Sequence, residues 1–464
     1  MVNRIISVGD DFTLPASVKT TDANLPAASN AAAVALKLDA NKVGAASGVA
    51  PLGADSKVPD ASLPTRLGDV ALNAAIGLAT EGLARPRGNT LVITGDSRMA
   101  GELTGSDAGT EYRVDQQGIF TWANLFLRQR FSVLKVTGIV GNKVSDLLAR
   151  YQTDVLAYQP QNVLIGIGVN SVTNNVPTET IKSELTQIFA LNDSIGATTI
   201  ILTINPRDAH TAGQRTSLVD VNRWLLNLSR RGVIVIDVTS AVVTATDMIW
   251  KTGYTNGADG LHQNRTAAAR MGKRIADVLE PLYPARDRLP VYAGDTQNVV
   301  ANPFMDGAGT VATGWSSIGG TTKSLVAPTD LVPGNWQRIE TSGAETVQLR
   351  QMTIACPPAW IGKKIAATFE VKLDTVTALT NMQLQCNQLD GGGATIMSTS
   401  GPYLNPGDAG VYELANLPGL TVPTVFRTPD ATVKAAAVTL QFLFQLSGFN
   451  GVVRVRRGSI TLVD

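Results

Sequence analysis

Histidine and cysteine are scarce in this chain of 464 residues, which has two of each. The two cysteines, Cys356 and Cys386, exclude a fold built on a disulfide framework, and the sequence leaves open whether they pair. The two histidines, His210 and His262, are the only imidazoles that can act as a base near neutral pH. A histidine-dependent site must therefore contain one of them.

Charge is also sparse: charged residues make up 17% of the chain, and the formal net charge is +1. This balance excludes a broad electrostatic field, so we expect neither nucleic acid nor a membrane as a partner. No run of about eighteen apolar residues indicates a membrane span. The first residues carry too short an apolar stretch for a signal peptide. The length and the 44% hydrophobic content predict about two to four domains.

Aromatic residues are nearly absent from residues 1–88, where Phe12 is the only one. Alanine, serine and asparagine dominate there, and glycine and proline interrupt residues 44–63, so this segment cannot bury a compact core alone. We therefore expect an extended N-terminal segment. It is either a disordered linker or a segment that orders by packing against copies of itself, and the sequence leaves both open.

Strand and helix patterns alternate from residue 87 to residue 284. Short β-branched-rich runs predict strands at residues 91–94, 132–137, 162–167, 198–204 and 233–238. Helical patterns lie around residues 119–130, 144–151, 178–193, 213–231 and 264–282. Strands separated by helices of this length form βαβ units. We predict an α/β domain of three layers, with a parallel sheet covered by helices on both faces.

Polar motifs follow these strands where each strand ends. Gly95-Asp96-Ser97 follows the first, a glycine turn with Gly141 the second, and Gly168-Val-Asn170 the third. The loop after the fifth strand ends in Asp259-Gly-Leu-His262. The carboxyl ends of parallel strands meet at one edge of a sheet, where functional groups gather. We therefore expect Ser97, Gly141, Asn170, Asp259 and His262 to lie close together.

These residue types suit the hydrolysis of an ester. A serine hydroxyl is a weak nucleophile that needs an adjacent base held in place by a third group. We expect Ser97 to attack a carbonyl, His262 to take its proton and Asp259 to orient the imidazole. The N–H groups of Ser97 and Gly141 and the amide of Asn170 would form the oxyanion hole. This chemistry needs no metal and no organic cofactor.

Each motif has a simpler explanation when taken alone. Gly-Asp-Ser and Gly-x-Asn are common turns, and an aspartate before a helix is a common cap. The order of the motifs and their placement at strand ends favour the catalytic interpretation of Ser97, Asp259 and His262. We interpret His210 as a solvated loop residue rather than a substrate contact. Arg98 could contact an anionic sugar, but we interpret it as an exposed side chain without a function.

Together these blocks resemble the SGNH (GDSL-like) hydrolase family over roughly residues 88–284. The matching positions are Gly95-Asp96-Ser97, the turn with Gly141, Gly168-Val-Asn170 and Asp259-x-x-His262. The resemblance implies an SGNH-type serine esterase with the catalytic and oxyanion residues assigned above. One departure is Ser171, where many members carry aspartate.

Residues 303–464 change to short alternating runs separated by Gly, Pro, Asn and Asp turns. This pattern predicts an all-β domain, most simply a sandwich of the jelly-roll kind. Asn302-Pro-Phe, Gly314-Trp315, Trp336 and Gly458-Ser-Ile loosely resemble carbohydrate-binding-module-like sandwiches. This resemblance implies either sugar binding or a role in holding an oligomer together.

The tryptophans and arginines of this region have structural interpretations. We interpret the tryptophans as core residues and the arginines near the C-terminus as a solvated face. These are Trp315, Trp336 and Trp360, and Arg454, Arg456 and Arg457.

Residues 48–64 (Gly-Val-Ala-Pro-Leu-Gly-Ala-Asp-Ser-Lys-Val-Pro-Asp-Ala-Ser-Leu-Pro) resemble a linker near the N-termini of bacteriophage tail fibre and tail spike proteins. The resemblance implies a place in the phage tail, attachment to other tail proteins through the N-terminal segment, and a homotrimer. A virion protein needs no signal peptide, because virions leave the cell by lysis.

We therefore predict three parts: an extended virion-attachment segment (1–88), an SGNH hydrolase domain (89–290) and a β-sandwich (303–464). The predicted function is a tail spike or tail fibre esterase that removes O-acetyl groups from a bacterial surface polysaccharide, either capsule or O-antigen. Two alternatives remain. One is a non-catalytic receptor-binding tail fibre, and the other is a free bacterial polysaccharide acetylesterase.

Overall fold

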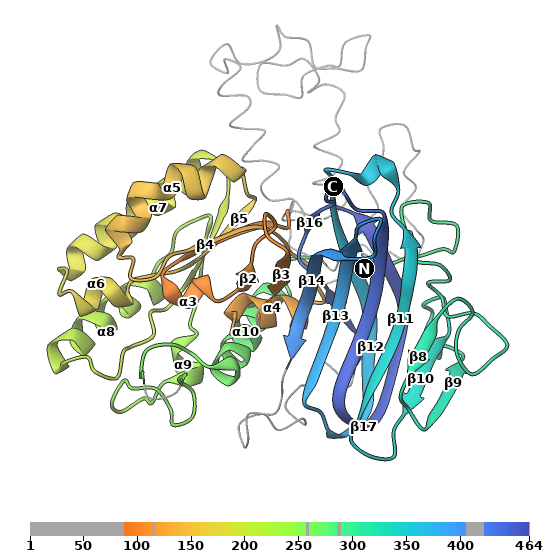
Figure 1. The fold of residues 1–464 in the computed structure, drawn as a ribbon. Coiled ribbons are helices and arrows are strands. Elements are labelled where there is room, and N and C mark those ends of the chain that lie inside the picture. The colour runs from red at the N-terminus through yellow and green to blue at the C-terminus, as the bar shows by residue number, and fades with distance from the viewer. Residues whose placement is uncertain (1–87, 115–116, 257–258, 285–288, 405–421, 464) are drawn as a thin grey trace, which may run out of the picture. The chain divides into compact units, whose positions relative to one another are not determined.

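The computed structural model describes residues 88–114, 117–256, 259–284, 289–404 and 422–463. These residues belong to one compact unit with an α/β part and a β-rich part (Figure 1). The N-terminal segment expected over residues 1–88 lies outside the described residues, apart from Gly88. Among the described helices, none is both long and apolar enough to cross a membrane. The predicted domain boundaries stay a prediction.

The α/β part is built on a five-stranded parallel sheet. Its strand order is β4-β1-β5-β6-β7. The strands are β1 (Thr90–Gly95), β4 (Ser132–Gly138), β5 (Asn162–Gly166), β6 (Thr198–Leu202) and β7 (Val233–Ile236). The predicted strand ends differ from these by at most two residues. The predicted α/β fold with a parallel sheet is thus confirmed.

Helices cover both faces of this sheet (Figure 1). The apolar core on one face includes residues of α4 (Ile119–Phe126) and α10 (Arg265–Leu279). The core on the other face includes residues of α5 (Val144–Asp154), α7 (Thr178–Ser194) and α8 (Ala212–Leu226). Strands buried on both faces need continuous apolar runs, and Leu91, Val92 and Ile93 of β1 are all buried.

Glycine is required at the end of β1. Gly95 has a φ of +148°, and a Cβ there would lie 2.0 Å from the carbonyl oxygen of Gly166 in β5. No other residue fits this close approach. The next residue, Asp96, then donates its N–H to the same Gly166 oxygen at 3.2 Å. The turn that follows β1 is therefore held against the end of β5.

The β-rich part is organised by β17 (Thr439–Leu462), a strand of 24 residues. Its first half pairs with β11 (Glu345–Ala355) and β13 (Asn381–Leu389). Its second half pairs with β10 (Trp336–Glu340) and β12 (Lys364–Ala378). The two halves of β17 therefore have different partner strands, and β17 connects these two groups of strands. The predicted β-rich C-terminal region is confirmed, and its jelly-roll character stays a prediction.

Aromatic residues fill the interior of this region. The Trp315 and Phe369 rings stack with centroids 5.6 Å apart, and Phe442 meets Phe369 edge-on at 5.1 Å. Trp336 and Trp360 are also buried. The interpretation of these tryptophans as core residues is confirmed.

A short hairpin links the α/β part to the β-rich part. It consists of β2 (Leu103–Gly105) and β3 (Glu111–Val114), and β3 pairs in parallel with β14 (Thr395–Leu404). Trp122 and Leu125 of α4 also belong to the apolar core of the β-rich part. The sequence did not predict this junction.

The solvated face expected for the C-terminal arginines is wrong for two of them. Arg456 and Arg457 are 0% and 1% exposed. Their Nε atoms lie 2.8 and 3.0 Å from the same oxygen of buried Glu370. The register between β12 and β17 shifts here and Arg457 has a φ of +54°, so the regular alternation of side chains is broken. Arg454 is only partly buried and pairs with Asp374.

Replacing Glu370 by glutamine should destabilise the protein. Two buried guanidinium groups would lose their shared anion, and breaking a buried pair typically costs about 3–5 kcal/mol. Urea unfolding measures this loss. The matched control is Glu179→Gln, because Glu179 pairs with Lys182 at the surface and such pairs are worth at most about 1 kcal/mol. Equal stability of the two variants would contradict the prediction.

Candidate active site

Ser97, His262 and Asp259 form one hydrogen-bonded chain. Ser97 is the first residue of α3 (Ser97–Ala100), directly after the β1 turn. Its Oγ lies 2.8 Å from Nε2 of His262, and Nδ1 of His262 lies 2.8 Å from Oδ2 of Asp259. The side chains of His262 and Asp259 are 36% and 38% exposed, so a substrate at the surface can reach them.

The Asp259 carboxylate fixes the orientation of the imidazole. Its Oδ1 accepts the N–H groups of Leu261 at 2.8 Å and His262 at 3.0 Å. Partial burial alone would raise the pKa of Asp259, but these hydrogen bonds and the His262 ring outweigh it and hold that pKa below its ordinary value. An ionised carboxylate only accepts hydrogen bonds. Nδ1 of His262 therefore carries the proton, and Nε2 faces Ser97 as an acceptor.

Two of the predicted oxyanion residues, Gly141 and Asn170, lie on neighbouring segments. Asn170 belongs to α6 (Val169–Thr173), and its Nδ2 donates to the carbonyl of Asn142 at 3.1 Å. Gly141, the residue before Asn142, is exposed and has a left-handed φ of +79°. Within the described chain, the N–H groups of Ser97 and Gly141 have no hydrogen-bond acceptor. The structure thus places Asn170 beside the Gly141 turn, with N–H groups available.

Ser171, where many members of the family carry aspartate, has a local structural role. Its Oγ accepts the N–H of Val144, the first residue of α5, at 3.0 Å. The first N–H groups of a helix have no partner within the helix, and a side-chain oxygen can satisfy one of them. Ser171 therefore fastens the end of the Gly141 loop to the Asn170 loop.

Arg150 fastens the same loop to the sheet. Its guanidinium donates to the carbonyl of Gly95 at 3.0 Å, to the carbonyl of Thr137 at 2.7 Å and to Oδ1 of Asn142 at 2.8 Å. The ends of β1 and β4 and the Gly141 turn are thus held by one side chain. No motif in the sequence marks this residue.

Arg98 holds the histidine loop from the other side. The expectation of an exposed side chain is wrong, because Arg98 is buried and burial lowers its pKa to about 10. Its guanidinium donates to the carbonyls of Asn205, Pro206 and Leu261 at 2.6, 2.6 and 3.1 Å. The side chain of Gln263 donates back to the Arg98 carbonyl at 2.9 Å. The residues on either side of His262 are therefore both tied to the residue after Ser97.

His210 does not join the hydrogen-bonded chain of Ser97. It is 3% exposed, so its interpretation as a solvated loop residue is wrong. Its Nε2 lies 2.9 Å from Oγ1 of Thr173. Burial, together with Arg98 and other nearby arginines, lowers the pKa of His210 to about 4. His210 is thus a neutral structural residue beneath the site.

A serine–histidine–aspartate chain at the strand ends of a parallel α/β fold is typical of serine hydrolases. Residues 93–292 match the GDSL-like Lipase/Acylhydrolase family. This part of the chain is a GDSL-like acylhydrolase domain, and hence a hydrolase of the esterase class. Across the described residues there is no cluster of three or more His, Cys, Asp and Glu side chains that could hold a metal ion.

The chain is similar to several solved structures over part of its length. An alpha/beta hydrolase from the metagenome of Lake Arreo, Spain, is 22% identical, with 44% of this chain and 100% of that chain covered and a TM-score of 0.34. A catalytic mutant of an acetylxylan esterase from Geobacillus stearothermophilus is 17% identical, with 44% and 100% covered and a TM-score of 0.34.

A third similar structure is the enzymatically active domain of tailspike protein 4 of bacteriophage CBA120. It is 16% identical, with 36% of this chain and 22% of that chain covered and a TM-score of 0.25. No curated protein matches the chain.

Replacing Arg98 by lysine should lower kcat with little change in KM. A single ammonium group cannot donate to three separate carbonyls, so the His262 loop would shift, and small misplacements of catalytic groups can cost about 100-fold. Kinetics with p-nitrophenyl acetate measure the effect. The control is Arg274→Lys, an exposed position on α10. An unchanged kcat in Arg98→Lys would show that other contacts hold the loop.

His210 should make the protein less stable as the pH falls below 7. The unfolded chain takes up a proton near the ordinary histidine pKa of about 6.5, whereas folded His210 stays neutral down to about pH 4. Stability is therefore lost as the pH falls through this window. Urea unfolding near pH 7.5 and pH 5 should show a smaller loss for His210→Gln than for wild type. Equal losses would contradict this.

Proposed function

We propose that this protein is an esterase that removes O-acetyl groups from a bacterial surface polysaccharide, as part of a phage tail spike or tail fibre. The observation that carries the proposal is the hydrogen-bonded chain of Ser97, His262 and Asp259, with an exposed imidazole. The esterase class is a property of the GDSL-like domain. The acetyl group, the glycan and the tail are the proposed parts.

The first half of the reaction transfers the acetyl group to the protein. Ser97 Oγ attacks the carbonyl carbon of the ester while Nε2 of His262 takes the hydroxyl proton. The negative oxygen of the tetrahedral intermediate is stabilised by the N–H groups of Ser97 and Gly141 and by the Asn170 amide. When the intermediate collapses, the C–O bond to the sugar breaks, and the sugar oxygen takes the proton back from His262.

The second half releases acetate. Water attacks the acetyl-Ser97 carbonyl carbon, and His262 takes a proton from the water as it attacks. The tetrahedral intermediate breaks its bond to Ser97 Oγ, which regains its proton from His262. Asp259 stays ionised throughout and stabilises the imidazolium in both halves.

A small acyl group on a hydrophilic chain fits the surroundings of Ser97. In the described part of the chain, two large apolar side chains of the Gly141 turn are exposed, those of Ile139 and Val140. They form a small apolar surface. A lipase for long acyl chains needs a larger apolar surface, so an acetyl group is the better match. The linker-like residues 48–64 support the tail assignment. In this proposal the N-terminal segment binds other tail proteins, and the chain forms a homotrimer.

A non-catalytic receptor-binding fibre is the second candidate, but a pure binder has no need for the Ser97–His262–Asp259 chain. A free bacterial polysaccharide acetylesterase would use the same chemistry without the tail. Acetate release and virion location separate these alternatives.

The Ser97→Ala variant should lose activity by several orders of magnitude, because removing the nucleophile of such a set leaves only about 10³–10⁴-fold catalysis over water. Acetate release is measured first from p-nitrophenyl acetate. It is then measured from a panel of O-acetylated xylan, capsular polysaccharides and O-antigens. The matched control is Ser183→Ala, an exposed position on α7.

Equal turnover by Ser97→Ala and wild type would remove Ser97 as the nucleophile. Turnover of p-nitrophenyl acetate without acetate release from any polymer would overturn the polysaccharide assignment and leave the esterase class intact.

A further inference from the structure

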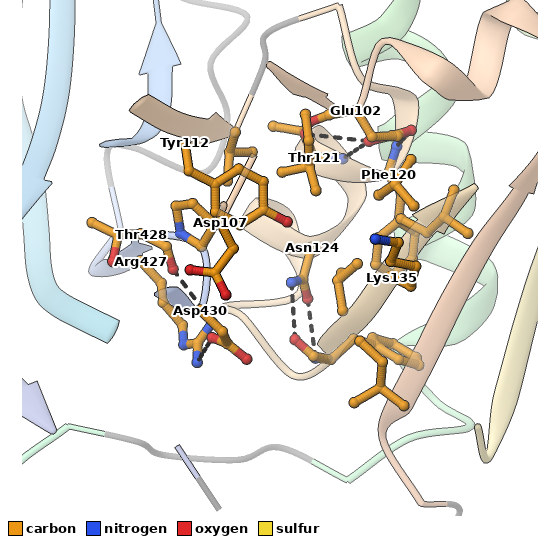
Figure 2. Close-up of a pocket in the computed structure, with 18 of the residues that line it drawn as sticks. Glu102, Asp107, Tyr112, Phe120, Thr121, Asn124, Lys135, Arg427, Thr428 and Asp430 are labelled. Carbon is orange, nitrogen blue, oxygen red and sulfur yellow. Dashed lines mark hydrogen bonds and ion pairs between the residues drawn. The ribbon is translucent and has the colours of Figure 1, made fainter. Parts of the chain in front are cut away.

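A cavity lies between the α/β part and the β-rich part, near the end of α3. It is bounded by hairpin β2–β3, by β4 and α4, and by residues 427–430 after β15 (Thr424–Arg427) (Figure 2). We call this cavity the hairpin pocket. Its volume is about 340 Å³, which falls within the range of ligand sites, about 300–1,000 Å³. The residues from 427 onward lie outside the stretch that matches the hydrolase family.

The hairpin pocket is preformed. Strand β3 is fixed to β14 by parallel pairing, with Tyr112 opposite Thr399. The Asp107 carboxylate accepts the N–H of Thr432 at 2.6 Å and its hydroxyl at 2.7 Å. Lys434 donates to the Asp107 carbonyl. Both sides of the pocket are thus held in place before any ligand arrives, which lowers the entropic cost of binding.

The polar groups of the pocket include both acidic and basic side chains. Its lining includes as many carboxyl as basic side chains: Glu102, Asp107 and Asp430, and Lys135, Lys364 and Arg427. Arg427 pairs with Asp430 on one side, and Glu102 caps α4 on the other by accepting the N–H groups of Phe120 and Thr121 at 2.7 and 2.8 Å (Figure 2). A ligand with many hydroxyl groups suits such a lining better than a hydrocarbon or a polyanion.

Tyr112 offers both a ring face and a hydroxyl to such a ligand. Burial, with Asp430 and Asp107 nearby, raises the pKa of Tyr112 to about 12, so its hydroxyl stays a donor at neutral pH. Within the described chain, this hydroxyl and the ammonium groups of Lys135 and Lys364 have no hydrogen-bond or ion-pair partner. Both lysines are exposed and line the pocket. Aromatic rings with a polar end stack on sugar C–H faces while hydrogen-bonding to hydroxyls.

One end of the hairpin pocket reaches the nucleophile turn. Ala100 and Gly138 line it. Ala100 is the last residue of α3, which Ser97 begins, and a helix rises about 1.5 Å per residue, so the two lie about 5 Å apart along the axis. Gly138 is the last residue of β4 and precedes the Gly141 turn. Through Ala100 and Gly138, the wall of the hairpin pocket is thus close to both Ser97 and the Gly141 turn.

From this arrangement we infer that the hairpin pocket binds sugar units of the same polysaccharide chain whose O-acetyl group is placed at Ser97. The inference rests on the proposed function and deepens it: the substrate is a polymer or long oligosaccharide, and the β-rich part contributes directly to its recognition. Tyr112, Lys135 and Lys364 are then specificity residues that never touch the reacting ester.

The test compares a polymer with an ester too small to reach the pocket. The variants are Tyr112→Phe, which keeps the ring, and Lys364→Ala, which changes an exposed side chain. Their matched controls are Tyr292→Phe, at an exposed tyrosine outside the pocket, and Lys363→Ala, the exposed neighbour of Lys364. The substrates are p-nitrophenyl acetate and the O-acetylated polysaccharide from the panel that wild type deacetylates fastest.

Each pocket variant should lower kcat/KM on the polymer by about three- to tenfold through KM, which is the range for one lost hydrogen bond. Turnover of p-nitrophenyl acetate should stay within about twofold of wild type, as for both controls on both substrates. An unchanged polymer-to-small-ester ratio in both pocket variants overturns the pocket assignment and leaves the proposed function standing. If wild type deacetylates none of the polymers, the proposed function fails, and the pocket assignment fails with it.

Discussion

The hydrogen bond between Ser97 and His262 joins residues 165 positions apart in the sequence, and the loops around it are arranged to keep it. Two buried or partly buried guanidinium groups do most of this. Arg98 ties the His262 loop to the nucleophile turn, and Arg150 ties the Gly141 turn to the ends of β1 and β4. Because a buried cation without acceptors is costly, any drift of these loops would leave guanidinium N–H groups unsatisfied. The hydrogen bonds of these guanidinium groups therefore hold the site together as much as apolar packing does.

The α/β sheet and the residues at its edge were predictable from local patterns. A buried parallel strand needs a continuous apolar run, and the runs of β1, β4 and β5 are each followed by a glycine-containing turn. Strand positions could therefore be predicted to within two residues. Because parallel strands end at one edge, Ser97 and the Asp259–His262 loop could be expected at the same edge of the sheet. The glycine at the end of β1 also has a local cause, because there is no room for a side chain at Gly95.

The polar residues that became buried could not be predicted in this way. Arg98, His210 and Arg456 all read as surface residues, and their burial depends on partners far away in the sequence. For Arg456 the partner is Glu370, and a register shift between β12 and β17 disrupts the regular alternation beside it. The pairing of β3 with β14 was missed for a related reason. A strand of four residues carries too little periodicity to mark its partner.

That pairing of β3 with β14 bears on how the chain can be divided. A strand contributed by the hydrolase stretch completes a sheet of the β-rich region, and Trp122 of α4 lies in the same apolar core as Trp315. Cutting the chain between residues 290 and 303 would separate β3 from β14 and expose this shared core to water. The hydrolase and β-rich parts are therefore not interchangeable modules. If parts of related proteins were exchanged, the fold would be preserved only when both parts were transferred together.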